Sequence, residues 1–339
     1  MKIVCFDVKD YEREKLTALS ELFDEVVLLE DSFQVNFDEN LPKIQDADVI
    51  SVFVNSRVFE DKLKNLQGLK LIATRSTGFS HIDLDYCKAQ NIQVVTVPRY
   101  GDVTVAEYAF GLLFALSKKI MLSSSDLKNN IIEPDNYIGS DLFGKTVGVI
   151  GVGAIGRQFC RIANGIGLKV LGYDLYPSEE AKEKYNVNFV NFDELLAQSD
   201  IISVHAPSTK ENIHLLDEAE FAKMKDGVVV INTARGEIIN TKALYDALLS
   251  GKVSAAGLDV LECEDILTNQ DRFLQKDECK NAACLQKTLL NHRLLTMKNV
   301  IVTPHMAFDT KEAIERILDT TVENIQGFLS GNIQNTVIK

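Results

Sequence analysis

The chain has 339 residues, of which 46% are hydrophobic and 25% charged, and its formal net charge is −13. These values are typical of a globular protein with two domains, and the acidic excess argues against binding to nucleic-acid phosphates. No secretory signal is visible at Met1, and the longest strongly apolar run, Tyr108 to Leu116, is too short to cross a bilayer. We therefore expect a cytoplasmic protein that binds neither nucleic acid nor membrane.

The cysteines do not form a recognisable metal-binding or redox motif. The six of them, at positions 5, 87, 160, 263, 279 and 284, form no C-x-x-C pair. In a long chain without a signal peptide we expect reduced thiols. A zinc site built from Cys279 and Cys284 is disfavoured because no matching ligand pair accompanies them, and we predict no bound metal.

The first hundred residues alternate apolar and helical segments. The predicted strands are Lys2–Asp7, Glu25–Leu29, Val49–Val54, Leu69–Thr74 and Gln93–Val97. Helices are predicted at Tyr11–Leu22 and Phe59–Leu66. This alternation is typical of a parallel sheet with helices on both faces, here without a nucleotide fingerprint. The turn Arg75–Gly78 follows one strand, and it either lines a cleft or is a plain turn.

A long helix is predicted from Val103 to Met121, after Pro98 ends this first pattern. Its middle is apolar on nearly every side, whereas a surface helix would have a polar face. We therefore expect it to be covered either by both domains or by a partner subunit. It is predicted to connect the domains and to contribute to a homodimer contact.

The segment from Thr146 to Asp174 has the pattern of a dinucleotide-binding βαβ unit. Between the strands Val147–Ile150 and Leu168–Tyr173 lie a helix and three glycines in the spacing G-x-G-x-x-G: Gly151, Gly153 and Gly156. These positions permit a tight turn, a close approach of the backbone to a pyrophosphate and close packing of the helix on the strand. Asp174 ends the second strand, where its carboxylate can accept the ribose hydroxyls and repel a 2′-phosphate. The segment predicts NAD binding.

Strands and helices continue to alternate beyond this unit. Further strands are predicted at Ile201–Val204, Val228–Asn232, Ala255–Leu258 and Val300–Thr303, and helices at Phe192–Gln198, Glu218–Met224 and Thr241–Ser250. We predict a doubly wound Rossmann domain over residues 100–303, with Asp265–Asn299 as an insertion over its cleft. The helix Thr310–Leu329 is expected to pack on the first unit. Residues 1–99 and 304–339 would then form a discontinuous, flavodoxin-like α/β substrate domain.

Polar residues end three strands of the second domain. Arg235 follows one strand, Asp259, Glu262 and Glu264 follow the next, and His305 follows the last. An arginine can bind a carboxylate through two hydrogen bonds, and a histidine supported by a carboxylate can deliver a proton. Each also has a structural alternative: a surface ion pair for Arg235, a loop charge for Glu264 and a helix cap for His305. Together they predict the reduction of a keto acid.

The motifs resemble those of the D-isomer-specific 2-hydroxyacid dehydrogenases along essentially the whole chain. The matching segments are GVGAIG (151–156) with Asp174, INTARG (231–236), LDVLECE (258–264), TPHMAF (303–308), RSTGFSHIDL (75–84), VPRYG (97–101) and HAPSTKENIHLL (205–216). Within this family the sequence looks most like the D-lactate dehydrogenases, which reduce pyruvate with NADH.

The resemblance implies roles for individual residues. Arg235 would bind the substrate carboxylate, His305 would donate and accept the proton, and Glu264 would pair with His305. Thr77, Gly78 and Tyr100 would help to hold the substrate. The NAD site would be lined by Gly151, Gly153, Ala154, Ile155, Gly156, Asp174, Ala206, Pro207, Asn212, Thr233, Ala234 and Asp259.

Two departures leave the substrate side chain open: Asp309 stands where relatives commonly have Tyr, and Met306 is unusual beside the histidine. One alternative is the same chemistry on a bulkier 2-keto acid. Another is a non-catalytic NAD(H)-sensing adaptor, because corepressors of this fold keep the Arg, Glu and His but carry long extensions. Phosphoglycerate dehydrogenase is disfavoured because no regulatory domain follows Leu329. Formate dehydrogenase is disfavoured because it has Gln at the position of Glu264.

Overall fold

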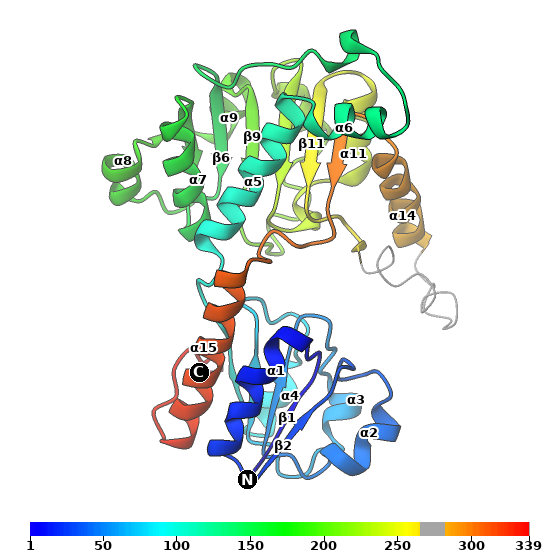
Figure 1. Cartoon of the computed structure of the whole chain (residues 1–339). Coiled ribbons are helices and arrows are strands. Elements are labelled where there is room, and N and C mark those ends of the chain that lie inside the picture. The colour runs from blue at the N-terminus through cyan, green and yellow to red at the C-terminus, as the bar shows by residue number, and fades with distance from the viewer. Residues whose placement is uncertain (265–281, 339) are drawn as a thin grey trace. The chain divides into compact units, whose positions relative to one another are not determined.

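The computed structural model describes residues 1–264 and 282–338, and the chain forms two compact units (Figure 1). Unit 1 comprises Met1–Tyr100 and Thr310–Lys339, and unit 2 comprises Gly101–Asp309. The sequence predicted that the chain re-enters the first domain at residue 304, whereas in the structure the second segment of unit 1 begins at Thr310. Residues 305–307 belong to unit 2 because their backbone N–H groups donate to the backbone carbonyl and the carboxylate of Asp259.

Unit 1 is built on a five-stranded parallel sheet in the order β2-β1-β3-β4-β5. Its strands are β1 (Lys2–Cys5), β2 (Glu25–Leu28), β3 (Val49–Val52), β4 (Leu71–Thr74) and β5 (Gln93–Val95). β1, β3 and β4 are buried along their whole length, which explains why their sequences are continuously apolar rather than alternating. This strand order is that of flavodoxin-like folds.

Helices cover both faces of the unit 1 sheet. They are α1 (Asp10–Thr17) with the 3₁₀ turn η1 (Ala18–Glu21), α2 (Phe37–Ile44), α3 (Glu60–Leu63), α4 (Leu84–Ala89) and α15 (Lys311–Leu329). One core joins the sheet to α2, α3 and α4, and the other joins it to α1 and α15. α15 lies beside α1 in Figure 1 and buries Leu318 and Ile325 against this second core. The apolar side chains that recur at helical spacing along α15 thus pack against the sheet of unit 1.

Unit 2 contains a seven-stranded parallel sheet in the order β12-β11-β10-β9-β6-β7-β8. Its strands are β6 (Thr146–Ile150), β7 (Lys169–Tyr173), β8 (Asn188–Phe189), β9 (Ile201–Val204), β10 (Val228–Asn232), β11 (Val253–Leu258) and β12 (Val300–Val302). The chain moves outward from β6 to β8 and then returns to β9 on the other side of β6. This reversal is the topological switch point at which doubly wound folds bind nucleotides. The predicted α/β class with two doubly wound sheets is confirmed.

Two helical layers cover the unit 2 sheet. The helices are α5 (Asp102–Ser117), α6 (Ile120–Lys128), η2 (Pro134–Tyr137), α7 (Ala154–Gly165), α8 (Glu179–Tyr185), α9 (Phe192–Gln198), α10 (Glu218–Lys223), η3 (Gly236–Ile238), α11 (Thr241–Leu249) and α14 (Ala282–Leu295). α5, α7 and α8 share one core with the sheet, and α9, α10, α11 and α14 share the other.

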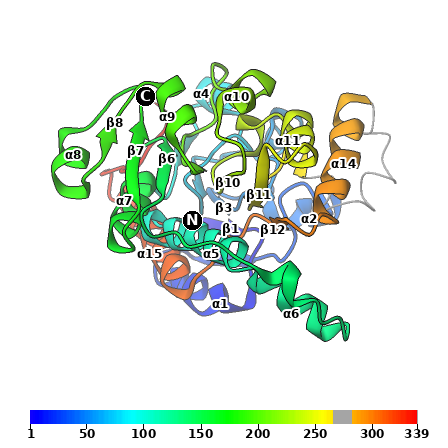
Figure 2. The same cartoon turned by 90° about the horizontal axis from the view of Figure 1, so that it is seen from above.

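The predicted helix Val103–Met121 is two helices in the structure. α5 ends at Ser117, and Lys119 has a left-handed backbone (φ +56°) that redirects the chain into α6, which projects beyond α5 in Figure 2. α5 is covered by α7 and by β10, β11 and β12 of its own unit. The apolar middle of the predicted helix is therefore buried largely by the sheet and by α7, and the predicted homodimer contact of this region stays a prediction.

The cysteines also differ from expectation, because Cys263 and Cys284 form a disulfide. They are 21 positions apart, and the fold brings their Cα atoms to 6.0 Å. Cys5, Cys87 and Cys160 are free and buried, and Cys279 lies outside the described residues. Of the predicted insertion Asp265–Asn299, residues 265–281 also lie outside the described part, and α14 follows. Within the described ranges, no helix is long and apolar enough to span a membrane, and no cluster of His, Cys, Asp and Glu could hold a metal ion.

Candidate active site

The glycine-rich turn joins β6 to α7 and packs closely against neighbouring backbone at Gly151 and Gly156. Gly151 has φ +87°, and a Cβ there would lie 2.6 Å from the backbone nitrogen of Ala206. A Cβ at Gly156 would lie 2.1 Å from the carbonyl oxygen of Gly151, so α7 packs directly on the turn. At Gly153, by contrast, a Cβ would meet nothing within 4 Å. Two glycines therefore permit close packing, and the third faces open space.

α7 begins at this turn with Ala154 and Ile155, and no side chain caps its first N–H groups, since the N-cap residue is Gly153. The positive end of the helix dipole and these N–H groups suit a phosphate. Asp174 directly follows β7 beside the turn, where its Oδ2 accepts the N–H of Val152 (2.7 Å) and its Oδ1 accepts the N–H of Tyr176 (2.8 Å). The carboxylate is half-buried and keeps lone pairs for further hydroxyl donors.

The loop after β9 contains the predicted cofactor residues Ala206, Pro207 and Asn212. Asn212 holds this loop, because its Nδ2 donates to the carbonyl of Pro207 (2.6 Å) and its Oδ1 accepts the N–H of Thr209 (2.7 Å). Ala206 lies against the glycine turn, as the position of a Cβ at Gly151 shows. The ends of β6 and β9 thus meet at the switch point.

Buried polar atoms without partners mark the ends of β9 and β10. His205 Nδ1 and Thr233 Oγ1 are both buried, and neither has a hydrogen-bond partner among the described residues. Burial holds the pKa of His205 down at about 3, so its imidazole is neutral. Unpaired buried polar atoms are rare and need an explanation. A hydrogen-bonding ligand at these strand ends, such as a dinucleotide, supplies one.

Arg235 follows β10, on a turn tied by Asn232. Asn232 Oδ1 accepts the N–H of Ala234 (3.0 Å), and its Nδ2 donates to the carbonyl of Arg235 (2.9 Å). The Arg235 side chain is exposed, and one of its guanidinium N–H groups donates to the carbonyl of Ala234 (2.6 Å). Among the described residues no carboxylate pairs with it. The remaining N–H groups are therefore available to an anionic ligand.

Asp259 holds the turn that carries His305. It is 1% exposed, and its carboxylate accepts the Thr303 hydroxyl (2.6 Å) and the N–H groups of Met306 and Ala307 (both 2.9 Å). Burial raises the pKa of Asp259, although these hydrogen bonds oppose the rise. The predicted contact of Asp259 with NAD stays a prediction. In the structure, the Asp259 carboxylate fixes the position of the turn that follows β12.

His305 and Glu264 are in direct contact. His305 Nδ1 lies 2.7 Å from Glu264 Oε1, and Glu264 Oε2 accepts the N–H of Leu261 (3.1 Å). Partial burial and the charge of Arg235 lower the pKa of His305. The hydrogen bond and charge of Glu264 and the charge of Asp259 outweigh them, so the pKa is raised overall. The imidazole is 41% exposed, so its other nitrogen remains accessible.

The residue beside this pair, Glu262, organises a network that the motifs did not reveal. It is 2% exposed; Oε2 accepts the Thr241 N–H (2.9 Å) and hydroxyl (2.7 Å), and Oε1 is 2.7 Å from His214 Nε2 and 2.6 Å from Lys287 Nζ. Burial raises the pKa of Glu262, yet the bonds from Lys287, His214 and Thr241 outweigh it and lower the pKa overall. A Cβ at Gly236 would lie 2.1 Å from the Leu261 carbonyl carbon, so the Arg235 turn packs closely on this loop.

The three predicted substrate-binding residues outside unit 2 lie in unit 1. Thr77 donates its hydroxyl to the carbonyl of Val97 (2.8 Å), the Ser76 hydroxyl donates to the carbonyl of Gly78 (2.7 Å), and the carbonyl of Tyr100 accepts a bond from Arg316 (2.8 Å). The preceding Arg75 is fully buried and bonds inward to Glu12 (3.2 Å) and to the carbonyl of Phe6 (2.7 Å). Arg75 thus anchors the turn, while the substrate contacts remain predictions.

Comparison with known proteins agrees with this geometry. Residues 110–307 match the family described as D-isomer specific 2-hydroxyacid dehydrogenase, NAD binding domain. The chain is 35% identical over 340 residues to D-lactate dehydrogenase of Escherichia coli, covering 98% of each chain. It is also 35% identical over 342 residues to an aromatic 2-oxoacid reductase of Clostridium sporogenes, covering 99% of this chain and 98% of that protein. The crystal structure of D-lactate dehydrogenase from Aquifex aeolicus, complexed with NAD and lactic acid, superimposes with a TM-score of 0.84 at 36% identity over 99% of both chains.

Proposed function

The chain belongs to the D-isomer-specific 2-hydroxyacid dehydrogenases, an NAD-dependent family, and we propose that it reduces pyruvate to D-lactate. The single observation that carries the proposal is the 2.7 Å contact between His305 Nδ1 and Glu264 Oε1, close to the exposed guanidinium of Arg235. This arrangement supplies a proton donor, a carboxylate that stabilises it and a cation for the substrate carboxylate.

Each residue then has one task in the reduction. Arg235 binds the substrate carboxylate with two parallel hydrogen bonds and so orients the keto group. NADH, when bound, supplies the hydride that adds to the keto carbon. His305 uses Nδ1 toward Glu264, so Nε2–H is the group that donates a proton to the keto oxygen. Glu264 stabilises the imidazolium, and in the reverse direction the neutral Nε2 accepts the hydroxyl proton.

The NAD site is assigned to the turn 151–156 and Asp174, with the loops at 206–212 and 233–234. Three features of the described residues support the fit: the open space at Gly153, the uncapped start of α7 and the Thr233 hydroxyl, which has no partner among them. Phosphate groups would bind the N–H groups of the turn, and Asp174 would accept the ribose hydroxyls.

A panel of 2-keto acids assayed with NADH tests the proposal. Pyruvate should give the highest kcat/KM, and His305→Gln should abolish most of this turnover while leaving NADH binding intact. Highest kcat/KM with phenylpyruvate or a branched 2-keto acid would assign a bulkier substrate, a result compatible with the aromatic 2-oxoacid reductase among the relatives. Met306, 37% exposed beside His305, is then the first residue to exchange. NADH binding without turnover of any keto acid would indicate an adaptor and refute catalysis.

We also propose a cytoplasmic homodimer. Its contact would lie in the predicted region Val103–Met121 and extend along α6 and the segment after it. Large apolar side chains exposed there are Val103, Ile120, Met121, Leu127, Ile131, Ile132, Ile138 and Phe143. Exposed large apolar side chains favour association. Light scattering should give twice the chain mass, and Leu127→Glu should lower it. A single-chain mass at every concentration would refute the dimer.

A further inference from the structure

The Cys263–Cys284 disulfide joins the loop after β11 to α14 at a point beside the candidate active site. Both cysteines are half-buried, so a small thiol can reach them. The other described cysteines, Cys5, Cys87 and Cys160, are buried, and burial raises the pKa of each to about 12. A thiol that does not ionise is unreactive. Among the described residues, redox chemistry is therefore confined to this one pair.

Cys263 stands between the two acidic residues of the loop. Glu262 on one side is held by Thr241, His214 and Lys287, and Glu264 on the other side contacts His305. The backbone at Cys263 is left-handed, with φ +53°. This conformation is unfavourable for a residue with a side chain and persists only where the surroundings hold it. The disulfide is one of the restraints that hold it.

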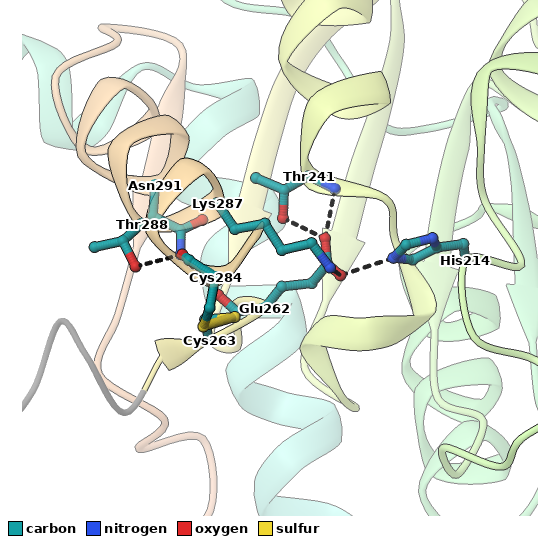
Figure 3. The surroundings of a disulfide bond; sticks show 8 residues. All are labelled: His214, Thr241, Glu262, Cys263, Cys284, Lys287, Thr288 and Asn291. Atoms are coloured by element: carbon teal, nitrogen blue, oxygen red, sulfur yellow. Dashed lines mark hydrogen bonds and ion pairs between the residues drawn. A yellow bond between two sulfur atoms is a disulfide. The ribbon is translucent and has the colours of Figure 1, made fainter. Parts of the chain in front are cut away.

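α14 presents a single face to this loop (Figure 3). Cys284, Lys287 and Asn291 are spaced i, i+3 and i+7, which places them on one side of a helix. Cys284 is bonded to Cys263, Lys287 Nζ lies 2.6 Å from Glu262 Oε1, and Asn291 Nδ2 donates to the Glu262 carbonyl (2.8 Å). α14 thus holds Glu262 by two polar contacts and is joined to Cys263 by the disulfide. Breaking the disulfide would release Cys263, the neighbour of Glu264, from α14 but leave Glu262 held.

We propose that Cys263 and Cys284 form a reversible redox site that positions Glu264 against His305. The inference rests on the proposed dehydrogenase function and assigns the cysteines a positioning role. A dithiol is the reductant: its thiolate attacks one sulfur to give a mixed disulfide, and its second thiol then displaces the protein thiol. Two electrons and two protons pass to Cys263 and Cys284, and the dithiol becomes a cyclic disulfide. Oxidation is the reverse exchange with a disulfide oxidant.

Reduction has a defined consequence for the proton donor. His305 faces Glu264 and Asp259, which favour its protonated form, and Arg235, which opposes it. With Cys263 released, the left-handed backbone relaxes and the contact of Glu264 with His305 is populated less. Asp259 and Arg235 stay in place, because their anchoring bonds do not involve the disulfide. The reduced enzyme therefore loses its histidine proton at lower pH than the oxidised enzyme.

The test compares pH profiles of kcat/KM for pyruvate reduction after treatment with oxidised or reduced dithiothreitol. A count of thiols in denaturing buffer should be two lower per chain in the oxidised form, because one disulfide removes two thiols. The oxidised and reduced profiles should coincide at about pH 6 and separate by roughly threefold or more at about pH 9, with the reduced form lower. Cys284→Ser and Cys263→Ser should reproduce the reduced profile under both treatments.

Two outcomes overturn the inference. Equal thiol counts after both treatments would show that the pair is not redox-active. Superimposable pH profiles with unequal counts would show that the disulfide only adds stability, even if the melting temperature changes. Cys279→Ser serves as the matched control and should keep the full redox response of the parent; a lost response would assign the effect to another cysteine. The absence of turnover in either redox state would instead refute the proposed function.

Discussion

Loss of the Glu262 carboxylate should destabilise unit 2. It is 2% exposed and receives bonds from Thr241 N–H and hydroxyl, His214 and Lys287 at 2.6–2.9 Å. Glu262→Ala leaves the buried Thr241 donors without an acceptor, while Lys287, with 32% of its side chain exposed, can return to water. Removing one partner of a buried ionic network costs about 3–5 kcal/mol. For a unit of this size, roughly 2–4 °C per kcal/mol predicts a fall in melting temperature on the order of 10 °C.

Differential scanning calorimetry measures this change, with Glu183→Ala on the exposed face of α8 as the matched control, expected within about 0.5 kcal/mol of the parent. The pKa of Glu262 is lowered in the folded chain, so its stabilisation is complete above the unfolded pKa of about 4.3 and is lost as the pH falls through the folded pKa. The difference between parent and variant should therefore shrink in acid. A melting temperature within about 2 °C of the parent at neutral pH would refute the reasoning.

Three further predictions concern the chemistry. The parent enzyme should prefer NADH over NADPH by about tenfold or more, because Asp174 repels a 2′-phosphate. Steady-state kinetics with both cofactors should show that Asp174→Ala reduces this preference, and equal use of both cofactors by the parent would contradict the assignment. Arg235→Lys should raise KM for pyruvate on the order of tenfold and lower kcat, because an ammonium cannot make the paired contact; a KM within about twofold of the parent would exclude Arg235 as the anchor. Glu264→Gln removes the charge that raises the pKa of His305, so the alkaline limb of the pH profile of pyruvate reduction should move toward acid, and lactate oxidation should become measurable at lower pH. Unchanged pH profiles in both directions would show that the Glu264–His305 contact does not govern the protonation of His305.

Much of the site was predictable because its parts are local in sequence. The spacing of Gly151, Gly153 and Gly156 defines a turn and the start of α7, and Asp174 follows from the length of one βαβ unit. Strand-end residues such as Arg235 and His305 were identifiable because buried parallel strands are continuous apolar runs. The polar residues that follow such runs lie at the same edge of the sheet.

What the sequence by itself determined, then, is the order of strands and helices, the dinucleotide turn and the residue types at the strand ends. Only the tertiary structure decided which of these side chains touch. The Glu264–His305 contact, the burial of Glu262 among Thr241, His214 and Lys287, and the Cys263–Cys284 bond all join segments distant in the chain. The break between α5 and α6 at Lys119 was also hidden. Periodicity reports which face of an element is apolar, whereas contacts between elements depend on how α14 and the loop after β11 pack on the same sheet.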